Sequence, residues 1–287
     1  MASAMVGTMD SDQDNERFVE ENRRMWDAWT PHHVTSSLYD IEGFKAGGET
    51  LDAVELDGVG DVTGKSLLHL QCHFGLDTLS WVRHCAAPVV GVDFSQVAID
   101  TARGLADELG VDARFICCDV VDTLDHLEGE RFDVVFTSHG AISWLPDLTP
   151  WARVVAGARE PGGVFFVAES HPTLWMFDEE LPESGLEFRY SYFDKGVLTQ
   201  QQSGSYAAPE APVQSTPHSW QHDFGAVVNA LAGEGLRITS LHEYPFLFYS
   251  WFPWMVKDEA GLYRLPEGMP DLPLMFSLTA TRDDTAR

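Results

Sequence analysis

Short apolar runs alternate with amphipathic stretches through the middle of this chain of 287 residues. The runs have the length of buried strands, and the stretches between them repeat apolar positions roughly every three to four residues. In SQVAIDTARGLADELG (95–110), Ser95 is a helix N-cap and Gly110 a stop signal. This alternation predicts right-handed βαβ units and a doubly wound, mostly parallel sheet. The expected strands are residues 67–70, 88–93, 113–119, 132–138, 164–170, 236–244 and 272–282, and the expected helices of the core are 77–85, 95–110, 149–163 and 223–235.

The segments outside this alternation follow other patterns. Residues 12–30 have apolar positions at helical spacing and predict an amphipathic helix that Pro31 ends, and the glycines within 43–48 predict a loop. Residues 171–219 contain extended aromatic segments separated by Gly and Pro, which predict a small antiparallel lid. No linker is apparent, so we expect one domain over 1–287. Its expected parts are an N-terminal cap (1–60), a core (61–170), the lid (171–219) and the end of the core (220–287).

The charge of the chain excludes some partners. It has 45 Asp and Glu against 18 Lys and Arg, a formal net charge of −27, which would repel phosphate backbones. No apolar run reaches the roughly 18–20 residues of a membrane span, and the first residues lack the pattern of a signal peptide. We therefore expect a cytoplasmic protein that binds neither nucleic acid nor membrane. An acidic chain with only four Lys also suits a high-salt cytoplasm.

Cysteine usage gives no sign of a metal site. The four cysteines form no C-x-x-C pair, so we expect free thiols and no metal.

The turn after the first expected strand carries the candidate chemistry. QCHFG (71–75) lies at the carboxyl edge of the sheet, where doubly wound folds bind their ligands. It lacks the G-x-G-x-x-G of dinucleotide sites, and the chain has no phosphate loop, which disfavours pyrophosphate binding. Asp93 closes the second strand and can accept both hydroxyls of a ribose, while Asp119 closes the third and can accept from an adenine amino group. Taken singly, each acid could equally cap the next helix or turn.

With these residues in place, the chain resembles the class I S-adenosylmethionine-dependent methyltransferases over residues 60–170. LHLQCHFG stands where that family has an L-D-L-G-C-G-x-G type of turn, GVDFS where it has its ribose acid, and CDV where it has its adenine acid. The turn looks like that of a bacterial subgroup, with His69 in place of an acid and Gln71 and His73 in place of two glycines. The resemblance implies a seven-stranded sheet of order 3-2-1-4-5-7-6 with strand seven antiparallel.

The resemblance also implies a cofactor site, for S-adenosylmethionine as donor and S-adenosylhomocysteine as product. Gly75 would approach the methionine part of the cofactor, Asp93 would hold the ribose, Phe94 would stack on adenine and Asp119 would hold its amino group. The expected cofactor-binding residues are Gln71, Cys72, His73, Gly75, Asp93, Phe94, Asp119 and Val120, with Tyr39 and Phe44, beside Trp26, closing over the cofactor from the N-terminal segment.

Methyl transfer from a sulfonium depends mostly on alignment, but an acceptor of high pKa also needs a base. His139 is the best-placed candidate base, because it ends the fourth strand beside the expected sulfonium. Glu169 and His171 follow the fifth strand, and His222 precedes the helix after the lid. Any one of these histidines could instead serve packing or capping. Seven aromatics in residues 244–254 suit an apolar cleft for a small organic molecule, or simply cover one face of the sheet.

The sequence thus predicts methyl transfer from S-adenosylmethionine to an oxygen or nitrogen of a small molecule. Two alternatives stay open. The missing glycines are compatible with a catalytically silent cofactor-binding protein, and a nicotinamide-dependent oxidoreductase has a related fold. The acceptor and the oligomeric state are left open.

Overall fold

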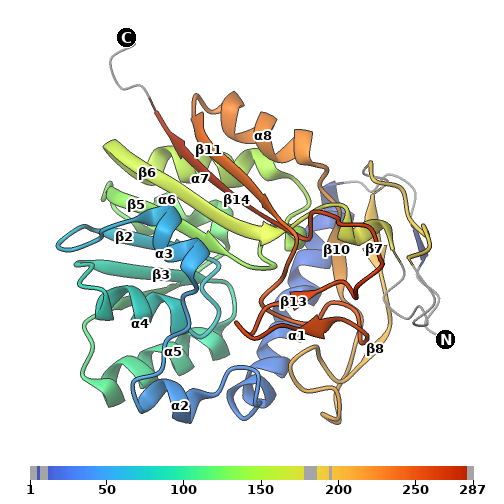
Figure 1. Ribbon diagram of the computed structural model, residues 1–287. Helices are drawn as coiled ribbons and strands as arrows, with labels where there is room; N and C mark the ends of the chain where they lie inside the picture. Colours follow the sequence, from blue (N-terminus) through green and yellow to red (C-terminus); the bar gives the residue numbers. More distant parts are fainter. Residues whose placement is uncertain (1–4, 7–11, 178–185, 194–195, 283–287) are drawn as a thin grey trace.

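The computed structural model describes residues 5–6, 12–177, 186–193 and 196–282, and a seven-stranded sheet forms its centre (Figure 1). The strands are β2 (Leu67–Leu70), β3 (Val89–Asp93), β4 (Arg114–Cys117), β5 (Phe132–Ser138), β6 (Arg159–Ser170), β11 (Arg237–Tyr244) and β14 (Met275–Thr281). Their order is β11-β14-β6-β5-β2-β3-β4, with β14 antiparallel to both neighbours and the remaining pairs parallel. Counted along the chain, this is the expected order 3-2-1-4-5-7-6, so the predicted fold is confirmed.

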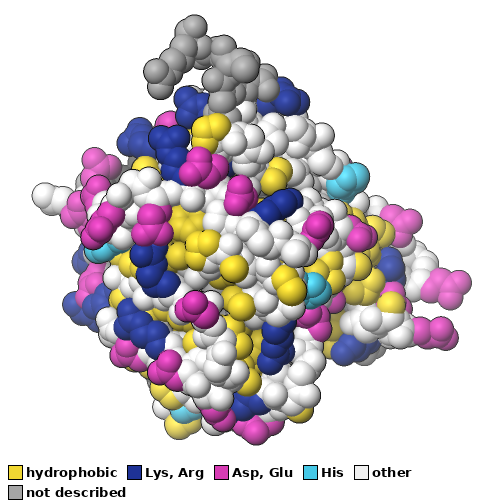
Figure 2. Space-filling model, turned by 90° about the vertical axis from the view of Figure 1, so that its left-hand side faces the viewer, with side chains coloured by type: hydrophobic (Ala, Val, Ile, Leu, Met, Phe, Trp, Pro, Cys, Tyr) yellow, Lys and Arg dark blue, Asp and Glu magenta, His cyan; other side chains and the backbone are white. Residues whose placement is uncertain are grey.

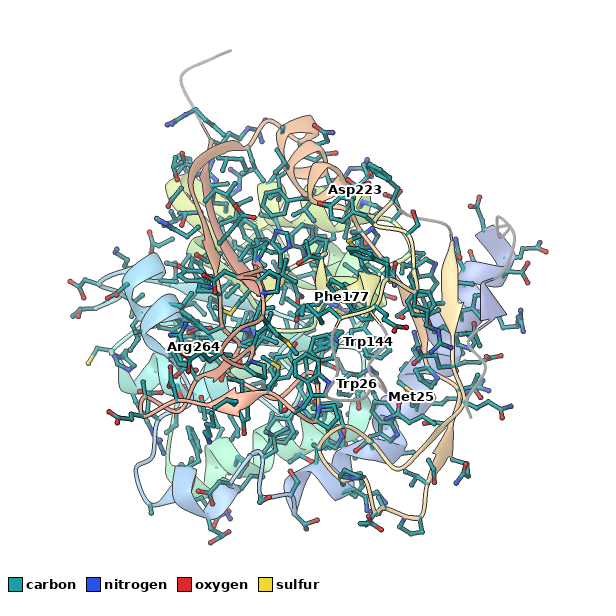
Figure 3. All side chains as sticks on the ribbon, turned by 45° about the vertical axis from the view of Figure 1, so that its right-hand side comes forward. Met25, Trp26, Trp144, Phe177, Asp223 and Arg264 are labelled. Atoms are coloured by element: carbon teal, nitrogen blue, oxygen red, sulfur yellow. The ribbon has the colours of Figure 1, made fainter. Side chains whose placement is uncertain are left out.

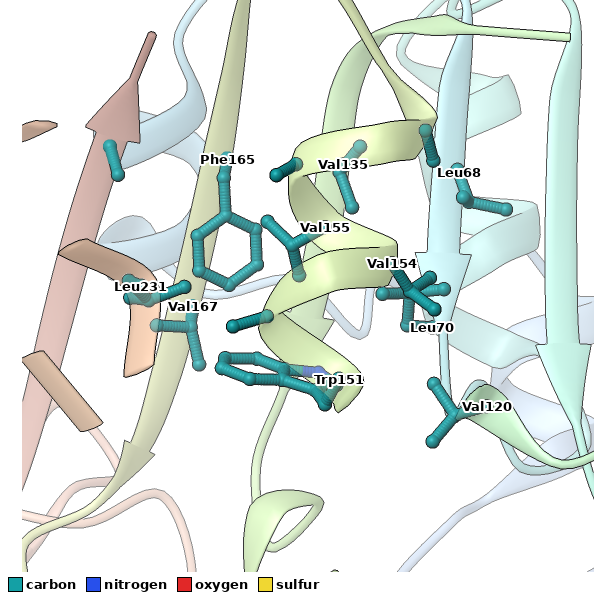
Figure 4. Close-up of a cluster of buried hydrophobic side chains, with 14 of the residues drawn as sticks. Leu68, Leu70, Val120, Val135, Trp151, Val154, Val155, Phe165, Val167 and Leu231 are labelled. Carbon is teal, nitrogen blue, oxygen red and sulfur yellow. The ribbon is translucent and has the colours of Figure 1, made fainter. Parts of the chain in front are cut away.

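Helices cover both faces of the sheet. They are α1 (Asp12–Val34), α2 (Ile41–Lys45), α3 (Ala53–Val59), α4 (Leu76–Arg83), α5 (Gln96–Leu109), α6 (Thr123–His126), α7 (Leu148–Ala158) and α8 (Phe224–Gly233), with short 3₁₀ turns at Val120–Asp122 (η1), Ile142–Trp144 (η2) and Leu174–Met176 (η3). On one face, Trp151 and Val155 of α7 pack against Phe165 and Val167 of the sheet and Leu231 of α8 (Figure 4). Helices α3, α4 and α5 cover the other face. Apolar burial on both faces explains why the central residues of the parallel strands are mostly apolar.

Three expectations about local structure were wrong. Helix α1 continues through Pro31 to Val34, because burial of Trp29, Thr30 and His33 outweighs the roughly 3 kcal/mol that an interior proline costs. Helix α2 covers the start of the loop predicted within 43–48, and α3, which begins with a capping box of Asp52 and Glu55, was not predicted. Helix α7 ends at Ala158 and not at residue 163, because β6 starts earlier than expected.

The segment predicted as a lid is antiparallel where the structure describes it. Strands β7 (Val197–Thr199) and β10 (His218–Trp220) pair with β1 (Met5–Val6), and β8 (Gln202–Ser203) pairs with β9 (Gln214–Ser215). A further hairpin of β12 (Val256–Lys257) and β13 (Tyr263–Arg264) was not predicted. Residues 178–185 and 194–195 of the predicted lid lie outside the described residues.

Helix α1 is joined to this antiparallel segment through a buried side chain. Asn22 is fully buried; its Nδ2 donates to the carbonyl of His218 at 2.6 Å, and its Oδ1 accepts from the His218 N–H at 2.9 Å. Glu21 bonds the His218 ring at 2.8 Å, and Phe18 stacks on that ring. The N-terminal helix and β10 therefore form one wall beside the carboxyl edge of the sheet.

We predict that Asn22→Ala lowers the free energy of unfolding by about 2 kcal/mol, because two buried backbone groups lose their partners. Urea denaturation measures the change. The control Asn229→Ala, at an exposed position of α8, should stay within about 0.5 kcal/mol of the wild type. If Asn22→Ala changed the free energy of unfolding as little as the control does, the bonds of Asn22 to His218 would not stabilise the contact between α1 and β10.

Candidate active site

The turn after β2 has backbone angles that glycine favours at three positions, but only one of the three is a glycine. Gln71, His73 and Gly75 have φ of +58°, +52° and +80°, all in the left-handed region. For the two non-glycine residues this conformation costs roughly 1–2 kcal/mol each. At Gly75 a Cβ would come within 2.6 Å of the Phe115 ring, so this position requires glycine. Strain of this kind is typical of functional sites.

Asp93 and Asp119 lie at the carboxyl ends of adjacent strands, as predicted. Asp93 is 8% exposed, and its two oxygens accept from the N–H groups of His73 at 2.8 Å and Ser95 at 2.9 Å. Burial raises the pKa of Asp93 to about 6 and also raises that of Asp119. Asp119 accepts from the N–H of Val121 at 3.2 Å. Each carboxylate keeps further lone pairs with which to bind a ligand.

A cavity of about 820 Å³ opens at this edge of the sheet. Seven of the ten expected cofactor-binding residues line it, namely Tyr39, Gln71, His73, Asp93, Phe94, Asp119 and Val120. The other three do not line it. Phe44 is buried under the guanidinium of Arg83, Cys72 is 4% exposed, and Gly75 begins α4. The volume is within the roughly 300–1,000 Å³ of small-molecule sites.

Aromatic rings from three separate segments cover the cavity. Trp26 of α1 and Trp144 of η2 lie side by side, with ring centroids 5.4 Å apart (Figure 3). Trp26 also meets the His73 ring at 5.1 Å, and the hydroxyls of Tyr39 and Tyr206 are hydrogen-bonded to each other. The sequence had suggested Trp26 and Tyr39 for this cover, but not Trp144 or Tyr206.

Buried polar atoms without partners mark one end of the cavity. Gln71 Oε1 and His73 Nε2 have no hydrogen-bond partner within the described part of the chain. The amide nitrogen of Gln71 is fixed, since it donates to the carbonyl of Ala141 at 2.8 Å. Burial lowers the pKa of His73 well below its usual value, so its ring is neutral. Buried polar atoms are usually paired, and a polar ligand in this cavity would supply the partner that these two atoms lack.

His139 lies in the wall of the cavity and is paired with an unexpected partner. Its Nε2 is hydrogen-bonded to the carboxylate of Glu55 on α3, and Phe248 packs edge-on at 5.1 Å. Burial by itself would lower the pKa of His139, but the charge and hydrogen bond of Glu55, with the charges of Asp77 and Glu169, raise it to about 9. His139 is therefore an imidazolium at neutral pH.

The other three candidate catalytic residues do not line the cavity. Glu169 accepts from the N–H groups of residues 140–142 at 2.7–3.3 Å and so fixes the loop after His139. His171 bonds Glu243 at 2.9 Å, and His222 bonds a backbone carbonyl at 2.7 Å. These contacts give the three residues structural partners, and their catalytic roles stay predictions.

Glu55 is the main functional residue that sequence reasoning missed. The spacing of Asp52 and Glu55 is that of a capping box and could have revealed the start of α3. Nothing in the sequence links Glu55 to a histidine 84 residues away.

Residues 67–163 match the family described as "Methyltransferase domain". The match covers 97 of the 287 residues, about a third of the chain. It contains the strained turn, both acids and His139, whereas Glu55, Trp26 and Tyr206 lie outside it. The resemblance to methyltransferases is thus confirmed for the core, while the subgroup suggested by LHLQCHFG stays a prediction.

Curated relatives cover part of the chain. A ubiquinone biosynthesis O-methyltransferase of Neisseria meningitidis serogroup C is 34% identical over 139 residues, 48% of this chain and 55% of that protein. A ribosomal RNA large subunit methyltransferase K/L of Syntrophotalea carbinolica is 31% identical over 137 residues, which are 43% of this chain and 19% of that protein. The chain therefore spans from a fifth to just over half the length of these relatives.

Among solved structures, an S-adenosylmethionine dependent methyltransferase from Mesorhizobium loti has the same fold. The TM-score is 0.57 with 20% identity, over 80% of this chain and 98% of that one.

Within the described residues, every helix is too short or too polar to cross a bilayer.

The charge of His139 predicts a pH dependence of stability. Its pKa of about 9 in the folded protein exceeds the ordinary 6.5, so the bound proton stabilises the fold fully below pH 6.5. As the pH rises through 9, up to about 3 kcal/mol of this stabilisation is lost. Urea denaturation from pH 6 to 10 should show a steeper decline for the wild type than for His139→Gln. Parallel curves would mean that the imidazolium does not exist.

Proposed function

We propose that this methyltransferase domain binds S-adenosylmethionine across the carboxyl ends of β2, β3 and β4. The methyl group would go to an oxygen or nitrogen of a small organic molecule. The observation that carries the proposal is the strained turn 71–75, which keeps a glycine-type backbone beside Asp93 and Asp119 on one cavity. Gln71 and His73 adopt a backbone conformation that is costly for residues other than glycine. A ligand that needs the chain to follow this path best explains why the cost is tolerated.

The residues present fit this cofactor from end to end. Asp93 has lone pairs for the ribose hydroxyls, and Phe94 and Val120 offer apolar contact to adenine beside Asp119. The unpartnered Gln71 Oε1 and His73 Nε2 would serve the amino-acid end. The sulfonium of the cofactor supplies an activated methyl group, so the protein need only align the acceptor and exclude water.

The charge around the cavity favours a small acceptor over a nucleic acid. Asp12, Glu16, Glu20 and Asp147 line the cavity, and Arg23, its one lysine or arginine among the described residues, is bound to Glu20 and Asp27. On the face shown in Figure 2, basic side chains are interspersed with acidic ones. Phosphodiesters need clustered Lys and Arg. Of the two kinds of relative, the small-molecule O-methyltransferase is therefore the better guide to the acceptor.

Calorimetric titration with S-adenosylhomocysteine tests the cofactor site directly. We expect micromolar affinity at one site, weakened more than tenfold by Asp93→Ala because the ribose loses its acceptor. Affinity should also fall as the pH drops through about 6, since protonation removes the Asp93 carboxylate. The control Asp107→Ala, on the exposed side of α5, should bind like the wild type.

The outcomes separate the alternatives. Absence of binding to the folded protein would refute the proposal. Tight binding without transfer of labelled methyl to a panel of phenols and amines would favour a catalytically silent cofactor-binding protein. Transfer to any acceptor in the panel supports the proposal and directs further substrate screening.

A further inference from the structure

Glu55 reaches the candidate active site from outside the segment that matches the methyltransferase domain. Its side chain is 2% exposed and is held from two directions. One oxygen accepts from the N–H of Asp52 at 3.1 Å, within the capping box of α3. The other bonds Nε2 of His139. A carboxylate with both oxygens fixed can hold an imidazole in one orientation.

The orientation of His139 leaves one ring nitrogen for the cavity. Nε2 is taken by Glu55, and Phe248 packs edge-on against the ring at 5.1 Å. Among the described residues, no hydrogen bond involves Nδ1. Because His139 lines the cavity and Nε2 is already bonded, we take Nδ1 as the nitrogen available to a bound molecule.

The groups around His139 are mostly acidic. Glu55 and Asp52 of α3, Asp77 of α4 and Glu169 of β6 are the carboxyl groups near it. His69 of β2 is neutral, because burial lowers its pKa to about 3. His139 is the one cation of this group. A second cation beside it, such as a sulfonium, would weaken its hold on the proton.

We propose that Glu55 is a positioning residue: it holds His139 by Nε2, so that Nδ1, after it has released its own proton to solvent, takes the proton of the methyl acceptor. The inference rests on the proposed function. The O–H or N–H bond of the acceptor breaks and its proton goes to Nδ1. A lone pair of the acceptor forms the bond to the methyl carbon, and the carbon–sulfur electron pair stays on sulfur. The donor loses one positive charge while His139 gains one.

The test follows the ring of His139 by nitrogen NMR of histidine-labelled protein, assigned by the signals that His139→Gln removes. In the wild type with S-adenosylhomocysteine, we expect His139 to titrate near pH 9. With S-adenosylmethionine, whose sulfonium is charged, the midpoint should fall by at least one pH unit. The neutral ring should carry its hydrogen on Nε2 and leave Nδ1 unprotonated.

Two variants of Glu55 separate charge from orientation. Glu55→Gln keeps an acceptor for Nε2 but removes the charge, so the midpoint should fall by at least two pH units, a hundredfold loss of proton affinity. Glu55→Ala should in addition lose the preference for the Nε2-protonated ring. The control Glu49→Gln alters an exposed pair with His84 and should leave His139 unchanged.

Three results would overturn the inference: an unchanged midpoint in Glu55→Gln, a neutral ring protonated on Nδ1, or equal midpoints with the two cofactor forms. Affinity for S-adenosylhomocysteine should change less than twofold in Glu55→Gln. Loss of binding in the wild type would instead refute the proposed function, so the two failures are distinguishable.

Discussion

The site depends on one constraint, the left-handed turn at the end of β2. Its course sets where the N–H of His73 meets Asp93, where the Gln71 amide meets the loop after β5, and where α4 begins. Three strands are thereby tied together at their carboxyl ends. Gln71 and His73 hold this path at a conformational cost that glycine would avoid, and in return they bring polar side chains to a place where glycine has none.

Those side chains change how the turn recognises a ligand. A glycine-rich turn binds mainly through close approach of its backbone. Here Gln71 and His73 line the cavity and each has a buried polar atom without a partner among the described residues, and Trp26 packs edge-on against the His73 ring. From the sequence alone, the missing glycines could be a sign of a lost site. The structure shows that Gln71 and His73 nevertheless adopt the left-handed conformation that glycine favours. This is why the backbone angles carry more weight than the residue types.

The sequence predicted the parts of the molecule that depend on local pattern. Strand periodicity and the acids at strand ends placed Asp93 and Asp119 correctly, because the carboxyl ends of parallel strands meet at one edge. It did not predict α3, nor the course of α1 through Pro31, which depends on tertiary burial. Glu55, Trp144 and Tyr206 reach the site through contacts distant in sequence, which no periodicity encodes.

The candidate site is built partly from the matched segment and partly from residues outside it, and this bears on the choice of substrate. The matched segment, residues 67–163, supplies the turn and the acids that face the expected cofactor. The groups around His139 and the aromatic cover come largely from elsewhere, with Glu55 on α3, Tyr206 in the antiparallel segment and Phe248 in the aromatic run. A match confined to the core therefore covers the turn and the acids but not Glu55, Tyr206 or Phe248. The methyl acceptor accordingly has to be established on this chain itself.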